Sequence, residues 1–261
     1  MSMVETIARS GDVVLRHMAR FRKFSTFMTD CLNRMVQRKC YNSAALDVLE
    51  KFVRFTLIRP FQLLFVLSAA IGAGGVWLIV TLSTTFGFSD YAAQLIGDIM
   101  IVQAPPLFAA LFIAMRASPT NTTEIALMKV SNQVAALEAL RIDPLGYLCV
   151  PRLAGSVISA LALAFLLIVM AFAGNELFSW LSARLDYPYH AQNLARIIAF
   201  DGLLVVALKS MLFGFFVTVV PLYHGLHPVA ADNPVPASVL RGMDNVLLAI
   251  FLIEGMSLIA S

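Results

Sequence analysis

The chain has 261 residues, of which 59% are hydrophobic and only 13% are charged, and its formal net charge is +3. Soluble domains are typically about 45–50% apolar and about 25% charged, so this composition excludes a disordered chain and argues against a soluble enzyme. Apolar stretches of about 20 residues with few charges are typical of helices that cross a membrane.

The positive charge is concentrated at the N-terminus. Residues 1–60 carry 11 Lys and Arg against 5 Asp and Glu, whereas the remaining 201 residues carry 8 against 11. A basic segment before the first apolar stretch favours a cytoplasmic N-terminus. No aromatic-interleaved basic motif accompanies it, so nucleic-acid binding is not indicated. The first 30 residues lack a continuous apolar core, so no cleavable signal peptide is expected.

Residues 10–36 have the periodicity of a basic amphipathic helix. Its apolar positions follow helical spacing: Val14, Met18, Phe21, Met28, Leu32 and Met35. Arg16, Arg20, Lys23 and Arg34 lie off that stripe. Such a helix lies either in a membrane interface or against a partner subunit.

A second amphipathic stretch ends at Arg59-Pro60, where a bend at the membrane surface is expected. Its apolar side is formed by Leu46, Leu49, Phe52 and Val53. We expect this stretch to lie along the cytoplasmic leaflet, with Leu49 and Phe52 in the acyl boundary and Arg54 and Arg59 at the head groups.

Five apolar segments follow, at residues 62–84, 94–115, 153–180, 199–223 and 237–260. Each is long enough to cross about 30 Å of hydrocarbon at about 1.5 Å per residue. The sequence therefore predicts an all-α integral membrane protein, with interfacial helices over residues 1–60 and a five-helix membrane domain over residues 61–261. The positive-inside rule places the N-terminus and residues 116–152 in the cytoplasm, and an odd number of spans places the C-terminus outside.

The cytoplasmic segment 116–152 has signals for a short helix. Asn121-Thr-Thr-Glu124 has the pattern of a capping box. A narrow apolar stripe follows at Leu127, Val130, Val134 and Leu137. Asp143-Pro144 predicts that a new helix starts there, with Asp as the N-cap and Pro at the first helical position. The amphipathic helix is either tucked against its own bundle or a docking helix for a cytoplasmic partner.

Motifs for catalysis and for cofactors are missing from the sequence. It contains neither G-x-x-x-x-G-K-[ST] nor H-E-x-x-H, so no phosphate loop and no zinc-protease site are predicted. Cys31, Cys40 and Cys149 form no C-x-x-C pair and are expected to be reduced thiols. His224 and His227 have no cysteine nearby in the sequence. We therefore predict no catalytic, metal or cofactor site in this chain.

Two ionisable residues lie well inside predicted spans. Lys209 is about 15 Å deep in the fourth span, and Glu254 is about 9 Å below the same surface in the fifth. Such residues usually face the interior of a helix bundle or a cavity. A lysine side chain can bridge that difference in depth, so Glu254 is the expected counter-ion of Lys209. The pair either holds the two spans together or serves transport.

The segment Glu124–Arg152 resembles the signature of the MlaE/YrbE permease family. The family pattern is approximately AELGTM-[RK]-VTEQIDALEVMGVDPxxYLVVPR, and this chain reads EIALMKVSNQVAALEALRIDPLGYLCVPR. The matching positions include Glu124, Met128, Lys129, Val130, Gln133, Leu137, Glu138, Asp143, Pro144, Tyr147, Leu148, Val150, Pro151 and Arg152. Lys209-Ser210, Phe213-Gly214 and Tyr223-x-Gly225 also match, and the resemblance covers roughly residues 40–261.

This resemblance implies the permease subunit of an ABC transporter for phospholipid or a related lipid in the bacterial inner membrane. It implies a homodimer, two cytoplasmic ATPase subunits that hold ATP and Mg²⁺, a hexameric periplasmic Mce-domain protein and, in some members, a STAS-domain subunit. The residues expected to couple to the ATPase are Glu124, Lys129, Gln133, Leu137, Glu138, Arg141 and Asp143. The residues expected at the lipid pocket are Lys209, Glu254 and Gln103.

The chain departs from the family pattern in the second span. Val102-Gln103-Ala104-Pro105-Pro106 stands where the family usually has Arg-Glu-Leu-Gly-Pro, so both charges are missing, and Glu254 stands where the family usually has Asp. The residues alone leave two other functions open: an ion-coupled secondary carrier that uses Lys209 and Glu254, and a membrane scaffold without transport. Such carriers usually have internal repeats, and none is found in this sequence.

Overall fold

The computed structural model describes residues 22–37, 43–87, 98–182, 200–228 and 233–260, together with Met18. Every regular element within these residues is helical, as the sequence predicts. A helix over residues 22–36 comes first. The others are α2 (Ser43–Val53), η2 (Arg54–Ile58), α3 (Phe61–Phe86), η3 (Asp98–Gln103), α5 (Ala104–Val130), α6 (Gln133–Ala139), η4 (Leu145–Cys149), α7 (Val150–Ser182), α9 (Phe200–Leu226) and α10 (Pro234–Ala260).

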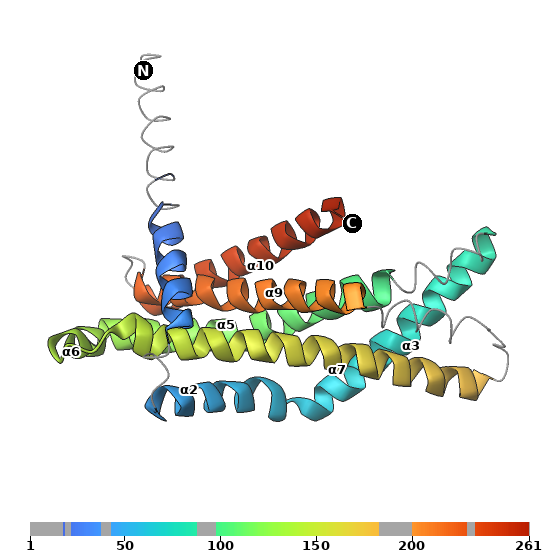
Figure 1. The fold of residues 1–261 in the computed structure, drawn as a ribbon, viewed down its shortest axis with the longest axis horizontal. Coiled ribbons are helices and arrows are strands. Elements are labelled where there is room, and N and C mark those ends of the chain that lie inside the picture. Colours follow the sequence, from blue (N-terminus) through green and yellow to red (C-terminus); the bar gives the residue numbers. More distant parts are fainter. Residues whose placement is uncertain are drawn as a thin grey trace, which may run out of the picture.

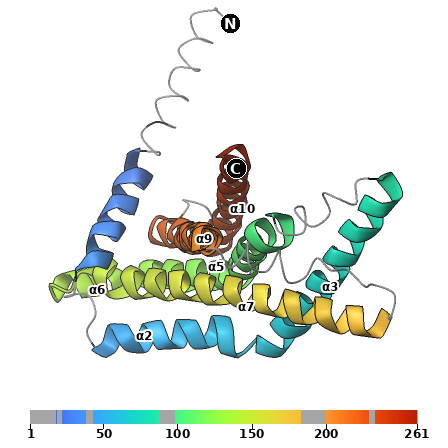
Figure 2. The ribbon, with the colours of Figure 1, turned by 45° about the vertical axis from the view of Figure 1, so that its right-hand side comes forward.

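The centre of the molecule is formed by α5, α7 and α9, which run side by side (Figures 1 and 2). Helix α10 packs on α9 and α5, whereas α2 and α3 pack on α7. The face that α5 presents to this core is built mainly from small residues: Ala109, Ala110, Ile113, Ala114, Ala117 and Ser118. Because these positions recur three and four residues apart, they form one narrow stripe that lets the neighbouring helices approach closely.

Two glycines mark the closest contacts between helices. A Cβ atom added at Gly214 of α9 would lie 2.8 Å from the Cβ of Ala160 and 2.9 Å from the Ser156 carbonyl oxygen of α7. At Gly225 it would lie 2.9 Å from the Cβ of Ile125 of α5. The Ser156 hydroxyl donates to the Gly214 carbonyl over 2.8 Å, so polar contacts join the two helices where their backbones meet. A larger side chain at either glycine position would force the helices apart.

Within the described residues, three stretches are long and apolar enough to cross a membrane: Leu145–Met170, Gly202–Leu226 and Pro234–Ile259. A fourth results if Ala45–Ile58 and Phe61–Gly72, which meet at a bend of 46°, form one span. The bend lies at Arg59-Pro60, where the sequence predicts it. The predicted second span, 94–115, falls partly outside the described residues, so the count of five remains a prediction.

Three short π-helical segments stand just before long helices. Two residues, Arg59 and Pro60, separate η2 from α3, and η3 and η4 run directly into α5 and α7. Pro151 is the second residue of α7 and has no backbone N–H to donate within the first turn of that helix. The wide turns therefore lie at the starts of the helices, where the α-helical hydrogen-bond pattern is not yet established.

The helix over residues 22–36 packs on the bundle of its own chain. Its buried side chains are Phe27 and Cys31, and the Phe24 and Phe27 rings lie 5.3 and 5.5 Å from the Tyr223 ring of α9. Met28 and Met35 of the predicted stripe contact the core, but Leu32 is exposed. The buried face is therefore rotated from the predicted one, because Phe24 and Phe27 pack on Tyr223 of α9, a partner that sequence spacing does not show.

Helix α2 also differs from its prediction at one position. Phe52 is only 8% exposed and lies against Gly155 of α7, so it does not enter the acyl boundary. Leu46, on the same predicted side, is 51% exposed. The absence of a side chain at Gly155 leaves room for the Phe52 ring, and this contact fixes the orientation of α2 on α7.

Burial protects the two described cysteines, and this leads to a labelling prediction. Cys31 and Cys149 are free thiols with no exposed surface, and burial raises the pKa of the Cys31 thiol to about 12. The thiolate is the reactive form, so Cys31 stays protonated and unreactive at pH 8. In a Cys40→Ser variant, we expect mass spectrometry to find no maleimide adduct under native conditions and two after unfolding in SDS. Rapid native addition at Cys31 would contradict the packing of helix 22–36.

Candidate functional site

A lysine lies within the buried stripe of α9. Val206, Ser210, Phe213 and Val217 are buried at helical spacing, and Lys209 belongs to the same face with only 5% of its surface exposed. The stripe is apolar apart from Lys209 and Ser210, whose hydroxyl donates to the Val206 carbonyl within the helix. Helical periodicity therefore carries the ammonium group of Lys209 into the bundle, where it needs partners from other helices.

The partners of Lys209 come from two other elements. Its Nζ lies 2.8 and 3.0 Å from the two carboxylate oxygens of Glu254 on α10. It also donates to the Oε1 atom of Gln103, the last residue of η3. The Glu254 side chain is 13% exposed, so both charges are largely removed from solvent. The three residues predicted at the lipid pocket are thus brought together, and the predicted ion pair is present.

Gln103 is an uncharged partner of Lys209. It occupies the position where the family pattern has Glu, and its amide oxygen still accepts a hydrogen bond from Lys209. The cluster contains one cation, Lys209, and one anion, Glu254. An ammonium group has three N–H donors. Three oxygen atoms surround the ammonium group of Lys209: both carboxylate oxygens of Glu254 and the Oε1 atom of Gln103.

The opposite end of the molecule contains the segment predicted to couple to an ATPase. Helix α5 does not stop before this segment but continues unbroken to Val130. The predicted capping box is therefore wrong: Asn121 and Thr122 are buried inside α5, and the Thr122 hydroxyl donates to the Ser118 carbonyl over 3.0 Å. After a turn at Ser131 and Asn132, only the short helix α6 remains of the predicted amphipathic helix.

Helix α6 ends in a left-handed turn at Arg141. The backbone N–H of Ile142 donates to the Leu137 carbonyl, and that of Arg141 donates to the Glu138 carbonyl, each over 3.0 Å. This is a Schellman motif, in which glycine is the usual residue at the left-handed position. Arg141 has φ +60° there, where the family pattern has Gly. The strained backbone holds an exposed arginine at the end of α6.

The start of the next helix agrees with its prediction. The Asp143 carboxylate accepts from the Gly146 backbone N–H over 3.0 Å, so Asp143 caps the helix that begins at Pro144. The same carboxylate forms a salt bridge with Arg34 of the helix over residues 22–36. The first residue of the predicted coupling set is also paired, because Glu124 binds Arg152 over 2.7 Å.

The predicted coupling residues therefore fall into two groups. Glu124 and Asp143 form salt bridges inside the chain, and Leu137 is partly buried against the core. Glu124 and Asp143 remain about half exposed although they are paired. The second group is exposed at the same end of the molecule: Lys129, Gln133, Glu138 and Arg141. We call this second group the coupling face.

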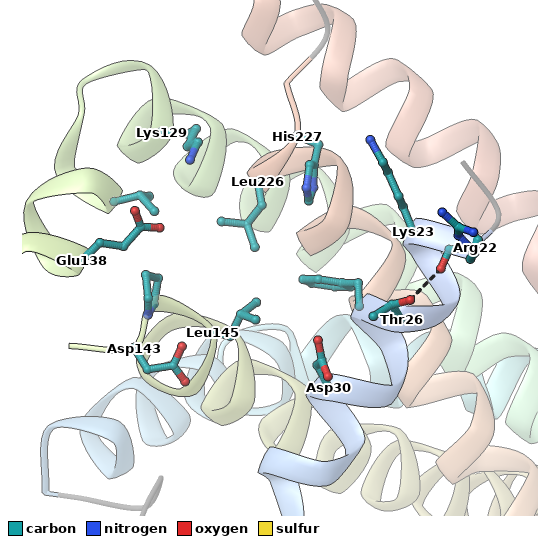
Figure 3. A pocket seen from close by; sticks show the side chains of 13 residues that line it. Arg22, Lys23, Thr26, Asp30, Lys129, Glu138, Asp143, Leu145, Leu226 and His227 are labelled. Atoms are coloured by element: carbon teal, nitrogen blue, oxygen red, sulfur yellow. Dashed lines mark hydrogen bonds between the residues drawn. The ribbon is translucent and has the colours of Figure 1, made fainter. Parts of the chain in front are cut away.

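A cavity of about 660 Å³ lies beside the coupling face (Figure 3). Lys129 and Glu138 lie on one side of it, and Arg22, Lys23 and Asp30 of the helix over residues 22–36 lie on the other. Its lining thus mixes both signs of charge, as a surface that contacts another protein often does. Sequence reasoning missed the contribution of this helix, since the residues involved are about 100 positions apart.

No group of three or more His, Cys, Asp and Glu side chains in the part of the chain that the structure describes is arranged to hold a metal ion. The features that remain are the buried cluster of Lys209, Glu254 and Gln103 and the coupling face. They lie at separate places along the same helices, because α5 ends at the face and begins next to Gln103.

Comparison with known proteins gives a family match over most of the chain. The model of the family described as Permease MlaE matches residues 51–259. A "Probable ABC transporter permease protein" of Rickettsia typhi is 25% identical over 154 residues, which are 57% of this chain and 60% of the relative. One of Synechocystis sp. is 26% identical over 189 residues, 70% of this chain and 72% of the relative. The "Intermembrane phospholipid transport system permease protein MlaE" of Haemophilus influenzae is 26% identical over 177 residues, 63% of this chain and 67% of the relative.

Proposed function

The chain belongs to the MlaE permease family, and we propose that it is the membrane-spanning subunit of an ABC transporter for phospholipid or a related lipid. The observation that carries this proposal is the buried cluster of Lys209, Glu254 and Gln103 between apolar helices. Lipid tails require an apolar lining, and a phosphate requires a cation or a hydrogen-bond donor. Lys209 is the cation of this cluster.

The proposed assembly is a homodimer in the bacterial inner membrane. Its coupling face and N-terminus are cytoplasmic and its C-terminus is periplasmic, so the lipid would be exchanged with a periplasmic Mce-domain protein, expected to be hexameric. Two cytoplasmic ATPase subunits would bind ATP and Mg²⁺ and drive the cycle, and a STAS-domain subunit accompanies some members. The apolar spans Leu145–Met170, Gly202–Leu226 and Pro234–Ile259 support the membrane location, and the family match supports the partners.

The coupling face gives a direct test of ATPase docking. Glu138 is exposed on α6 and lines the cavity of Figure 3 beside Lys129. In the unmodified chain, the docked partner faces the negative charge of Glu138. Glu138→Lys replaces it with a positive charge, and two like charges that face each other across an interface cost several kcal/mol of binding free energy. We expect co-purification of the ATPase and lipid-stimulated ATP turnover to fall at least about tenfold, while the membrane subunit still folds.

Asp47→Lys is the matched control, because Asp47 is an exposed carboxylate on α2 away from the cavity. It should leave both ATPase yield and ATP turnover unchanged. Normal values in the Glu138→Lys variant would remove Glu138 from the docking site. Lipid movement by the purified chain without any ATPase would favour an ion-coupled carrier over the proposed function.

A further inference from the structure

A second cavity lies between α2, η2, α5 and α7. It has a volume of about 400 Å³, and its lining is strongly basic. Lys51, Arg54, Arg59 and Arg152 contribute four cations, whereas Glu124 is the acidic residue of the lining. Glu124 is already bound to Arg152 over 2.7 Å, and Arg54 is bound to Glu50 over 2.6 Å. The cavity therefore retains a positive charge that the pairs formed by its lining residues do not neutralise.

Two buried donors in this cavity have no acceptor. The Nδ2 atom of Asn121 and the Nη1 atom of Arg152 are buried without a hydrogen-bond partner. Asn121 is only 4% exposed, and both residues line the cavity. Buried N–H groups in native proteins are almost always hydrogen-bonded. These two atoms therefore point to an acceptor that comes from outside the chain, and the surrounding cations favour an oxyanion.

An apolar groove begins where the basic cavity ends. The groove has a volume of about 710 Å³ and is lined mainly by Leu57, Ile58, Phe61, Ala162 and Leu166. Arg59 lines both the cavity and the groove. Ile58 and Phe61 are 64% and 48% exposed, so the groove opens to the surroundings of the bundle. A basic cavity that continues into an apolar groove is complementary to a single amphipathic ligand with an anionic head and an apolar tail.

We infer that the cavity and the groove together bind a phosphate-bearing glycerolipid of the cytoplasmic leaflet. The phosphate oxygens accept hydrogen bonds from Arg152, Asn121 and Arg59, with Lys51 nearby, and one acyl chain lies along the groove between α3 and α7. No residue of α9 or α10 lines either space, so this site is distinct from the cluster around Lys209. The inference uses the membrane topology proposed above but does not require that the bound lipid is transported.

A thiol placed in the cavity reports its occupancy. Thr120 lines the cavity and is partly buried, so Thr120→Cys is a small change, and a Cys40→Ser background leaves only the buried Cys31 and Cys149 besides it. The purified full chain in detergent is titrated with phosphatidylglycerol, diacylglycerol or inorganic phosphate, and the rate of maleimide addition at position 120 is measured. We expect phosphatidylglycerol to slow the reaction about tenfold at about ten times its Kd, with no effect of the other two at that concentration.

Arg59→Ala removes a charged hydrogen-bond donor to the phosphate, and hydrogen bonds to charged groups are stronger than those between neutral groups. We therefore expect the lipid concentration for half-maximal protection of position 120 to rise about tenfold. Arg241→Ala removes an exposed arginine from α10 and should not change it. Equal elution volumes on size exclusion would show that both variants are folded. Protection by inorganic phosphate alone would replace the lipid with a free anion, and equal protection by diacylglycerol would exclude recognition of the phosphate. Either result, or no protection, would overturn the inference.

The readout at position 120 separates this site from the transport proposal. If phosphatidylglycerol protects position 120 from maleimide but the complex does not transport lipid, the proposed function is rejected and the lipid site remains. If the complex transports lipid but phosphatidylglycerol does not protect position 120, only the lipid site is rejected.

Discussion

Replacing Lys209 with alanine is expected to prevent normal accumulation of the folded membrane subunit. The substitution leaves the Glu254 carboxylate inside the bundle without its cation and removes the donor to Gln103. Breaking a buried pair by removing one partner costs about 3–5 kcal/mol, which is a large part of the stability of a typical domain. The yield of monodisperse protein after extraction and the midpoint of thermal unfolding in detergent measure this loss.

A double substitution distinguishes a structural role of the pair from a role in transport. Lys209→Met combined with Glu254→Leu removes both charges and keeps the volume, a change that is often neutral or stabilising for a buried pair. We expect this variant to fold and to bind the ATPase but to retain less phospholipid and to lose lipid-stimulated ATP turnover. The control is Arg241→Met combined with Asp244→Leu, a pair of exposed charges on α10. Normal transport by the Lys209/Glu254 double variant would restrict the pair to holding α9 on α10.

The second large effect is expected at Gly214. Gly214→Ala places a Cβ atom 2.8 Å from the Cβ of Ala160 and 3.0 Å from the Cα of Val157, and both belong to the rigid helix α7. The helices must separate, which also weakens the hydrogen bond from the Ser156 hydroxyl to the Gly214 carbonyl. Overpacking of this kind typically costs about 1–3 kcal/mol. We expect a lower thermal midpoint and a lower yield of the assembled complex.

Gly74→Ala is the matched control for this substitution. A Cβ atom at Gly74 of α3 has no neighbour within 4 Å, so the change should be neutral or slightly stabilising, because alanine is the better helix former. Equal thermal midpoints for the Gly214 and Gly74 variants would show that α7 and α9 are not in close contact at Gly214.

The helices could be predicted from the sequence because a membrane span needs a long apolar run. Predicted spans 153–180, 199–223 and 237–260 correspond to α7, α9 and α10, which extend beyond them by two or three residues at four of the six ends. The position of Lys209 and Glu254 in such runs also made their pairing predictable, since each charge needs a partner in a low-dielectric surrounding. The depth of each charged residue in its span can be counted from the sequence alone, because a helix rises by a constant distance per residue.

Side-chain partners from distant parts of the chain could not be predicted in this way. A capping box at Asn121 is plausible from local spacing, but Thr122 instead lies against α9 and bonds to the carbonyl four residues earlier. The salt bridge from Arg34 to Asp143 joins residues 109 positions apart. Local patterns say which residues favour a helix end, whereas tertiary packing decides whether the helix stops there.

The π-helical segments determine where the chain tolerates a change in length. A π turn contains about one residue more than an α turn, so deleting one residue from η2, η3 or η4 restores ordinary α geometry and keeps the next helix facing the same way. A deletion early in α9 has no such compensation, because it rotates everything after it by about 100°. Lys209 would then turn away from Glu254, and Gly214 would turn away from α7. Single-residue length differences among relatives are therefore expected at Arg54–Ile58, Asp98–Gln103 and Leu145–Cys149.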